Sequence, residues 1–301
     1  MGLYCWLDAA GHVLARFDTM LHISKAVITA AGKTQRALPL QTLVDRDGEP
    51  KSALRIILDE VLDAGARDIA LVIAPGDQKA YEEAAGDAAG RLTFIEQKTP
   101  LGYGHALLAA RAFIESQPFL HLVSDHLYVS AIEAGCARQL VEVAKTHECA
   151  VSAVQATREN SIGLYGTIGG RPVTGSTSVY EVECVLEKPT PTLAEQRLAV
   201  PGMRAGHYLC FFGMHVLTPS VIDLLAQEAE RSNASVPLQL SPSLSRLAER
   251  EKYVACTLQG NRYNIGQRYG LFMAQLALAL HGADREWVLA NLVELLATRP
   301  H

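Results

Sequence analysis

Paired cysteines are missing from this sequence. Its six cysteines lie far apart, in no C-x-x-C pair and in no cluster with histidine: Cys5, Cys136, Cys149, Cys184, Cys210 and Cys256. Zinc sites and disulfide frameworks depend on closely or regularly spaced cysteines, so this spacing indicates neither. We expect buried, reduced thiols instead.

A surplus of basic residues is missing as well. The chain of 301 residues has 27 Lys and Arg against 32 Asp and Glu, which gives a net charge of −5. A protein that binds nucleic acid neutralises many phosphates with cations. We therefore expect no nucleic-acid partner.

The start of the sequence lacks a long apolar run. Residues 1–20 include Asp8, Arg16 and Asp18, and no stretch is long enough for a signal peptide or a membrane span. We expect a cytoplasmic protein with no membrane partner. Residues 1–22 are interpreted as an N-terminal extension, either an added strand-like segment or a flexible leader, with Met20 as an alternative start.

The composition, 49% hydrophobic and 20% charged residues, excludes a disordered or fibrous chain. Short apolar runs alternate with amphipathic stretches. Strands are predicted at Lys25–Ala30, Ile69–Ala74, Leu92–Gln97, Phe119–Val123 and Ala150–Gln155, and helices at Ser52–Ala64, Asp77–Asp87, Tyr103–Glu115 and Ala131–Thr146. This alternation predicts an α/β fold with a doubly wound, mixed and mostly parallel sheet. In such folds ligands bind at the carboxyl ends of the strands.

After residue 157 the pattern changes. The stretch Gly163–Pro189 is rich in Gly, Thr and Val and predicts a β-rich insertion, followed by a loop at Pro189–Gly206. The remaining elements are strands at His207–His215 and Tyr253–Leu258, and helices from Pro219, at Pro242–Arg250, Tyr269–His281 and Arg285–Thr298. We interpret the chain as one continuous α/β domain with C-terminal helices.

The loop after the first strand combines small residues with a cation. Ala31 and Gly32 let a ligand approach backbone N–H groups, and the Arg36 guanidinium matches phosphate oxygens. An ordinary tight strand-to-helix turn explains the same residues. This loop alone leaves both interpretations open.

A second loop runs from Gln97 into a predicted helix. Gly102 and Gly104 permit unusual backbone angles and leave room for a ligand ring, and His105 follows them directly. The amide of Gln97 offers both a donor and an acceptor, which suits the edge of a base, and a helix N-terminus favours anions. The alternative is a helix cap that happens to contain glycine.

Charged residues follow two further strands. The carboxylate of Asp125 can hold Mg²⁺ in phosphate chemistry, or it can cap the next helix. Glu187 can accept hydrogen bonds from sugar hydroxyls while Lys188 meets a phosphate. A surface ion pair at a strand end is the alternative for these two residues.

In their order along the chain, these segments resemble the bacterial sugar-phosphate nucleotidyltransferases, and most closely the UTP–glucose-1-phosphate uridylyltransferases. The segment KAVITAAGKTQRALP is similar to the opening strand and A-G-x-G-T-R-x-L-P loop of that family, and Q-x4-GYGHA, the most specific match, to its Q-x4-GLGHA. LYGTI resembles the A-Y-G-V segment, VLEKP the V-x-E-K-P motif, and Asp125 stands where the family has a metal-binding aspartate. LQLS at 238–241 and YNIG at 263–266 resemble Q-L-T and D-x-G. The resemblance runs from about Lys25 to His281.

This resemblance implies a Rossmann-like, GT-A-like nucleotidyltransferase domain over residues 23–282. Its nucleotide half covers about 23–157 and its sugar-phosphate half about 158–268, with a C-terminal helix in 283–301. The implied reaction is attack by a sugar 1-phosphate on the α-phosphorus of a nucleoside triphosphate, which releases pyrophosphate. UTP is the favoured nucleotide, with thymidine and cytidine triphosphates as alternatives, and a homo-oligomer is implied.

The same resemblance assigns a role to each site residue. Arg36 would stabilise the triphosphate, Asp125 would hold Mg²⁺, and Lys188 would neutralise the sugar phosphate. The implied nucleotide-binding residues are Ala31, Gly32, Gln97, Gly102, Gly104 and His105. The implied sugar-phosphate residues are Tyr165, Gly166, Glu187 and Lys188, and the metal ligands are Asp125 and Asn264.

The chain departs from the family pattern at three places. Thr34 and Gln35 precede Arg36 where the family has G-T, and Leu40 stands where the family has a phosphate-binding lysine. Lys33 or Lys51 could supply that missing cation. Asn264 replaces the second metal-binding aspartate and brings no negative charge, which lowers the expected metal affinity.

Losses of this kind leave two interpretations. Removing one charged contact from such a transition state costs about two to three decades in rate. The chain is then either a nucleotidyltransferase with altered catalytic details, or a non-catalytic homologue that binds nucleotide or sugar phosphate in a regulatory role. The retention of Arg36, Asp125, Glu187 and Lys188 favours the enzyme.

Overall fold

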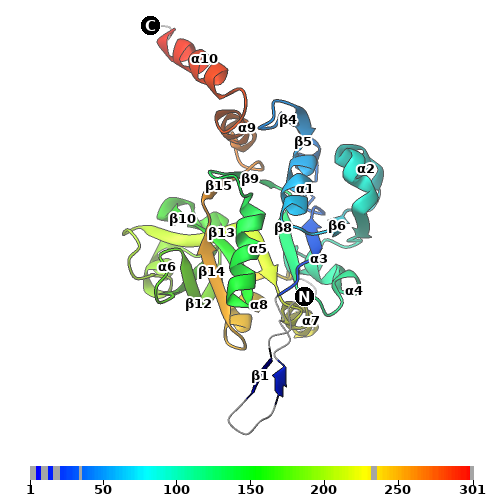
Figure 1. Cartoon of the computed structure of the whole chain (residues 1–301), viewed down its shortest axis with the longest axis vertical. Helices are drawn as coiled ribbons and strands as arrows, with labels where there is room; N and C mark the ends of the chain where they lie inside the picture. Colours follow the sequence, from blue (N-terminus) through cyan, green and yellow to red (C-terminus); the bar gives the residue numbers. More distant parts are fainter. Residues whose placement is uncertain (1–4, 8–12, 16–20, 34–35, 232–235, 299–301) are drawn as a thin grey trace.

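A central mixed sheet organises the molecule (Figure 1). The computed structural model describes residues 5–7, 13–15, 21–33, 36–231 and 236–298. Among these residues, nine strands form one sheet in the order β10-β14-β12-β11-β13-β8-β3-β6-β7. Their bounds are β3 (Lys25–Thr29), β6 (Asp68–Ile73), β7 (Leu92–Glu96), β8 (Phe119–Val123), β10 (Ala150–Arg158), β11 (Gly166–Pro172), β12 (Val179–Glu187), β13 (His207–Leu217) and β14 (Tyr253–Thr257).

The two sides of this sheet differ in strand direction. The neighbours β8, β3, β6 and β7 are parallel, as expected for strands joined by helices. From β13 onward the pairings are antiparallel, apart from the parallel pair β10 and β14. Strand β13 pairs with β10 along one edge and, along the other edge, with β11 near its start and with β8 near its end, so it joins the two sides. The predicted α/β fold with a mixed sheet is confirmed, although the described sheet has four parallel and five antiparallel pairings and so is not mostly parallel.

Helices cover both faces of the sheet, as the doubly wound prediction requires. Buried residues of α1, α2, α5 and α9 share one core cluster, and those of α3, α4, α7 and α8 share another. Successive side chains of a strand point to opposite faces of the sheet, so the strands contribute to both clusters. In β3, Ile28 belongs to the first cluster and Val27 to the second. The helices are α1 (Ala53–Asp63), α2 (Gln78–Ala85), α3 (Tyr103–Ala109), α4 (Arg111–Ile114), α5 (Cys136–His147), α6 (Pro191–Arg197), α7 (Ser220–Arg231), α8 (Ser241–Ala248), α9 (Gly270–Leu280) and α10 (Arg285–Ala297), with 3-10 turns η1 (Leu38–Leu40), η2 (Gly86–Arg91) and η3 (Glu159–Leu164).

Three short strand pairs complete the description. They are β1 (Cys5–Leu7) with β2 (Val13–Ala15), β4 (Thr42–Val44) with β5 (Pro50–Ser52), and β9 (His126–Ser130) with β15 (Gly260–Asn264). The first pair lies in the predicted N-terminal extension, whose other residues up to position 20, Met20 included, are outside the described residues.

Two local predictions were wrong. The helix expected at Ala131–Thr146 begins only at Cys136, because the preceding residues continue from β9, whose partner β15 lies far along the chain. The loop expected at Pro189–Gly206 contains α6. There the Thr190 side chain accepts a hydrogen bond from the Leu193 backbone N–H, and proline follows Thr190 at the first helical position.

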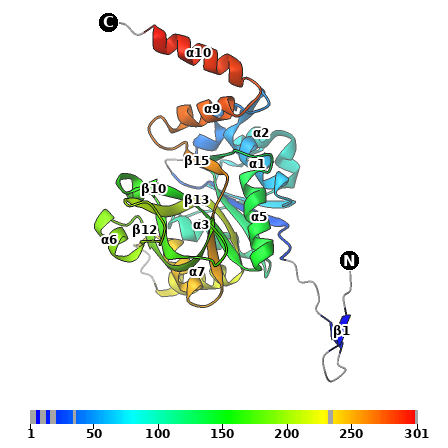
Figure 2. The ribbon, with the colours of Figure 1, turned by 60° about the vertical axis from the view of Figure 1, so that its left-hand side comes forward.

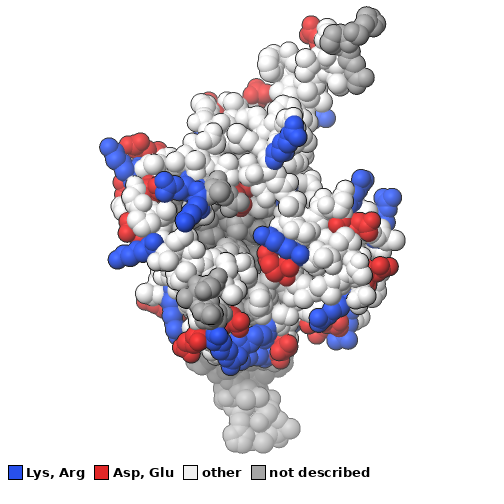
Figure 3. Space-filling view, turned by 180° about the vertical axis from the view of Figure 1, so that it is seen from behind, with Lys and Arg blue, Asp and Glu red and all other residues white. Residues whose placement is uncertain are grey.

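At the C-terminus α10 projects away from the rest of the molecule (Figure 2), whereas buried residues of α9 belong to the first core cluster. None of the residues of α10 is buried. Over the described ranges, no helix combines the length and apolar character needed to cross a lipid bilayer. Basic and acidic side chains are interspersed on the face opposite to that of Figure 1 (Figure 3).

Candidate active site

The loops at the carboxyl ends of β3, β7, β8 and β12 surround a cavity of about 580 Å³. This is the sheet edge where ligands bind in doubly wound folds. Of the residues predicted from the sequence, the cavity is lined by Ala31, Gly32, Gln97, Gly102, Asp125, Tyr165, Gly166, Glu187, Lys188 and Asn264. Arg36, Gly104 and His105 are outside this lining. The structure therefore brings most of the predicted nucleotide and sugar-phosphate residues to one place.

Arg36 lies beside the cavity rather than in its wall. Its guanidinium Nη1 is 3.5 Å from Asp77 Oδ2, and half of the side chain is exposed. The Tyr81 hydroxyl donates a hydrogen bond to the Arg36 carbonyl oxygen at 2.8 Å and so fixes the backbone there. Thr34 and Gln35, the altered positions of this loop, are outside the described residues.

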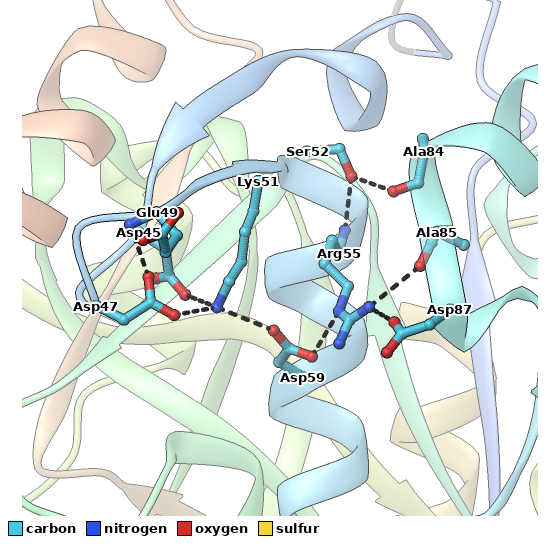
Figure 4. Close-up of polar contacts among 10 residues, drawn as sticks. All are labelled: Asp45, Asp47, Glu49, Lys51, Ser52, Arg55, Asp59, Ala84, Ala85 and Asp87. Carbon is cyan, nitrogen blue, oxygen red and sulfur yellow. Dashed lines mark hydrogen bonds and ion pairs between the residues drawn. The ribbon is translucent and has the colours of Figure 1, made fainter.

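The two lysines considered for the missing cation have different surroundings. Lys33 lines the cavity. The Lys51 ammonium is 2.7 Å from carboxylate oxygens of both Asp45 and Asp47 and 3.3 Å from Asp59 (Figure 4). Burial alone lowers the pKa of Lys51, but these hydrogen bonds outweigh it and raise the pKa. Lys51 is thus committed to the β4–β5 turn, and Lys33 remains the candidate.

Leu40 stands where the family pattern has a phosphate-binding lysine, so another residue has to supply that cation. It lies in η1, partly buried, and packs against the hydrophobic core. An apolar side chain in that position offers no charge to a phosphate.

The second loop holds Gln97 in place. Gln97 is 5% exposed, and its Nε2 donates to the Gly102 carbonyl oxygen at 3.2 Å and to His105 Nδ1 at 2.9 Å. Among the contacts of the described residues, none engages the Gln97 carbonyl oxygen Oε1, which leaves an acceptor for a ligand. His105 therefore orients Gln97 from behind the cavity.

The two glycines of this loop serve different purposes. Gly102 has φ 109, and a Cβ there would lie 2.5 Å from the Leu238 carbonyl oxygen, so only glycine fits the cavity wall. A Cβ on Gly104 would lie 2.8 Å from the Leu225 side chain and 2.9 Å from the Gln239 carbonyl oxygen. Gly104 thus allows close packing of α3 rather than contact with the cavity.

Asp125 and Asn264 meet at the same wall although they are far apart in sequence. Strand β9 follows Asp125 directly and pairs with β15, which ends at Asn264, and the Ile265 N–H donates to the Asp125 carbonyl oxygen at 2.9 Å. Burial raises the pKa of the Asp125 carboxyl, but the hydrogen bond from His126 Nδ1 at 2.8 Å outweighs it and the net pKa is lowered. Asp125 is therefore ionised at neutral pH.

The sugar-side residues come from β12 and from the turn before β11. Ser241 donates a hydrogen bond to Glu187 Oε2 at 2.5 Å, which fixes one carboxylate oxygen. Lys188 adopts the left-handed conformation with φ 46, and its N–H donates to the Tyr165 carbonyl oxygen at 3.1 Å. A Cβ on Gly166 would lie 2.6 Å from the Phe211 ring, so glycine is required there.

Sequence reasoning missed several residues of this site. The Arg262 guanidinium lies 3.9 Å from the centre of the Tyr165 ring, and Gln267 Nε2 donates to the Tyr165 hydroxyl at 2.9 Å. The further lining residues include Tyr103, His126, Phe211, His215, Gln239 and Ser241. Of these, Tyr103 had a signal as part of GYGHA, and Gln239 and Ser241 as part of the LQLS segment.

Comparison with known protein families matches residues 25–280 to the family described as "Nucleotidyl transferase". The chain belongs to the nucleotidyl transferase family. The resemblance drawn from the motifs is thereby confirmed. Helix α10 and the first 24 residues are outside the matched range.

Relatives within the nucleotidyl transferase family extend along almost the whole chain. The UTP–glucose-1-phosphate uridylyltransferase YngB of Bacillus subtilis is 30% identical over 302 residues, which cover 91% of this chain and 96% of YngB. A UTP–glucose-1-phosphate uridylyltransferase of Staphylococcus epidermidis is 29% identical, with coverage of 87% and 94%.

Solved structures support the same nucleotidyl transferase fold. A UDP-glucose pyrophosphorylase in complex with UDP-glucose has a TM-score of 0.69 at 22% identity and covers 85% of this chain and 98% of its own. The UTP-bound enzyme of Acinetobacter baumannii has a TM-score of 0.68 at 19% identity, with coverage of 91% and 100%. At these identities the likeness bears on the fold alone.

Proposed function

We propose that this nucleotidyl transferase moves the uridylyl group of UTP to a sugar 1-phosphate and releases pyrophosphate. The observation that carries the proposal is that one cavity is lined by Gly32 and Gln97 of the nucleotide loops together with Asp125, Glu187 and Lys188. The relatives named UTP–glucose-1-phosphate uridylyltransferase cover the same length of chain and favour UTP with glucose 1-phosphate.

The proposed reaction divides its work between two halves of one domain. The half at 23–157 would bind the triphosphate through Ala31, Gly32 and Arg36, and the half at 158–268 would bind the sugar phosphate. A sugar-phosphate oxygen attacks the α-phosphorus in line, and the bond to the leaving pyrophosphate breaks. Lys188 neutralises charge on the attacking phosphate, so that positioning and electrostatics lower the barrier.

Asp125 and Asn264 fit a magnesium ion as its protein ligands. Mg²⁺ is usually bound by one or two carboxylates together with substrate phosphates and water. Asp125 supplies an ionised carboxylate, and the Asn264 amide oxygen, which already accepts the Gly266 N–H at 2.9 Å, supplies a neutral oxygen. Among the described residues no group of three or more His, Cys, Asp or Glu could hold a metal without substrate. When bound, the ion would neutralise phosphate charge.

The alternative of an inactive, regulatory homologue is not favoured. Lys33 offers a cation at the cavity where Leu40 does not, and the catalytic candidates Asp125 and Lys188 converge there. The substitution at Asn264 is instead expected to weaken metal binding.

Release of pyrophosphate tests the proposed function directly. Purified protein with Mg²⁺, UTP and glucose 1-phosphate, and with a small panel of other nucleotides and sugar 1-phosphates, should release pyrophosphate from at least one pair. Because Asn264 is uncharged, the Asn264→Asp variant should need less Mg²⁺ for half-maximal rate. Silence across the panel, together with thermal stabilisation by UTP, would instead identify a binding protein.

We also propose that the chain forms a homo-oligomer through α9 and α10. Large apolar side chains are exposed on both helices: Phe272, Met273, Trp287, Val293, Leu295 and Leu296. With side chains of roughly 150–250 Å² that are between 47% and 70% exposed, these six residues offer on the order of 700 Å², close to the ~800 Å² that each partner contributes to a standard interface. A second copy of the same patch can cover it about a two-fold axis.

Light scattering after gel filtration measures this assembly. We expect a mass that is a multiple of the 32.6 kDa chain, and we expect Leu296→Glu to yield the single chain. Val236→Glu, at an exposed apolar residue outside both helices, is the matched control and should leave the mass unchanged. A wild-type mass of one chain would refute the interface.

A further inference from the structure

A line of buried polar side chains crosses the sheet and reaches the cavity at one end. The Tyr103 hydroxyl is 2.6 Å from His121 Nε2, and His121 stacks on His215 with ring centres 5.9 Å apart. His215 Nδ1 is within hydrogen-bond distance of the Ser152 hydroxyl, which also bonds the Tyr253 hydroxyl. Tyr103 and His215 line the cavity. Buried polar groups are costly unless they are paired, so this line needs an explanation.

The proton positions around His121 follow from its partners. Its Nδ1 lies 2.9 Å from the Val27 carbonyl oxygen, which can only accept, so Nδ1 carries a proton. Burial lowers the pKa of His121 to about 4, so the ring is neutral and its Nε2 has a lone pair. The Tyr103 hydroxyl therefore donates to Nε2. The oxygen of Tyr103 keeps its lone pairs for the cavity.

The protons around His215 are fixed from the other end of the line. Tyr253 is 1% exposed, and within the described part of the chain its hydroxyl bonds only Ser152, so it must donate to the Ser152 oxygen. Ser152 then donates to His215 Nδ1. Burial lowers the pKa of His215 as well, so the neutral ring carries its proton on Nε2. No described residue accepts that proton.

The part of the cavity wall next to the His121 ring, called the corner below, thus has an acceptor in Tyr103 Oη and a donor in His215 Nε2–H. The His215 ring lies edge-on to Phe211 with centres 4.9 Å apart, and Phe211 is the side chain that excludes a Cβ at Gly166 on the sugar side. Tyr103 is also the residue at which GYGHA departs from the GLGHA of the resembling family. The Tyr103 hydroxyl is thus a polar group that the GLGHA pattern lacks.

A donor and an acceptor in one corner match a group that is both acceptor and donor, which a hydroxyl is. We propose that Tyr103 and His215 recognise one hydroxyl of the bound sugar: His215 Nε2–H donates to the hydroxyl oxygen, and the hydroxyl hydrogen is donated to Tyr103 Oη. The substrate class is then a sugar phosphate that bears a hydroxyl at this position. The inference rests on the proposed function, since it presumes a sugar in the cavity.

Calorimetric binding of UDP-glucose and of UDP tests the corner without requiring turnover. Tyr103→Phe and His215→Phe should each weaken UDP-glucose at least tenfold while UDP changes less than twofold. Tyr253→Phe is the matched control: it removes a hydroxyl from the same line, leaves Ser152 able to donate to His215, and should change neither ligand. Circular dichroism and thermal unfolding verify that each variant is folded.

A series of monodeoxy UDP-glucose analogues identifies the hydroxyl. Wild type should bind one analogue at least tenfold less tightly than UDP-glucose, and this loss should vanish in Tyr103→Phe. Equal losses of UDP and UDP-glucose would place the nucleotide at the corner and overturn the inference, as would unchanged UDP-glucose binding. Because pyrophosphate release is measured separately, a wild type that binds UDP-glucose through this corner but releases none would refute only the proposed reaction.

Discussion

Asp125→Ala should abolish pyrophosphate release, with a loss of at least about 100-fold in kcat, while the protein stays folded. Asp125 is the ionised carboxylate at the cavity wall, and its loss removes the charged ligand proposed for Mg²⁺, which Asn264 cannot replace. The rate is measured by coupled pyrophosphate release over a range of Mg²⁺ concentrations. Added Mg²⁺ should not restore the rate, because the amide of Asn264 alone binds the ion weakly.

Asp68→Ala is the matched control for this variant. Asp68 is an exposed carboxylate at the start of β6, at the opposite end of that strand from the cavity, so its removal should leave the rate unchanged. Full activity of Asp125→Ala would show that another group carries the metal, and the assigned role of Asp125 would then be wrong.

Lys188→Gly should lose about two decades in kcat/KM for the sugar phosphate without a fall in Tm. The ammonium that neutralises the sugar phosphate is lost, which costs the rate. The backbone at Lys188 is left-handed, with φ 46, a conformation that costs a residue with a Cβ about 1 kcal/mol and glycine little. The relief of strain offsets the entropy that glycine loses on folding. Steady-state kinetics and thermal unfolding measure the two effects separately.

Glu148→Gly controls for the backbone effect of Lys188→Gly. Glu148 is also left-handed, with φ 50, and caps the end of α5 outside the cavity lining. Glycine should be tolerated equally well at this position, and the Glu148→Gly variant should keep its activity. Lys188→Met retains the strain and removes only the charge, so it should lose the same activity. Retained activity in both Lys188 variants would remove this lysine from the mechanism.

Local signals made much of this site predictable. Short buried runs such as IALVIA are typical of strands covered on both faces, and their carboxyl ends locate the cavity loops. Gln97, Asp125, Glu187 and Lys188 each follow such a strand, so their convergence followed from topology. Arg36 and His105 were found in the right loops, but only the side-chain packing shows that neither is in the cavity wall.

Other features depend on pairings that local sequence does not contain. His121 and His215 face each other because of the register of β8 against β13, whose paired residues are more than 90 positions apart in the sequence. The direction of each hydrogen bond along the line then depends on four further groups. Strands β9 and β15 are short, and their paired residues lie even farther apart in the sequence. The capture of Lys51 by three carboxylates also requires the fold, because Asp59 comes from α1.

Strand β13 has a consequence for how the protein unfolds. Along one edge its eleven residues pair with β10, and along the other edge they pair with β11 near the start of the strand and with β8 near its end. If the chain were divided near residue 157 and the two fragments separated, β8 would lose its neighbour β13, and its buried backbone N–H and C=O groups would be exposed. We therefore expect the segments on either side of that position to melt together, and the amides of β13 to be among the last to exchange with deuterium.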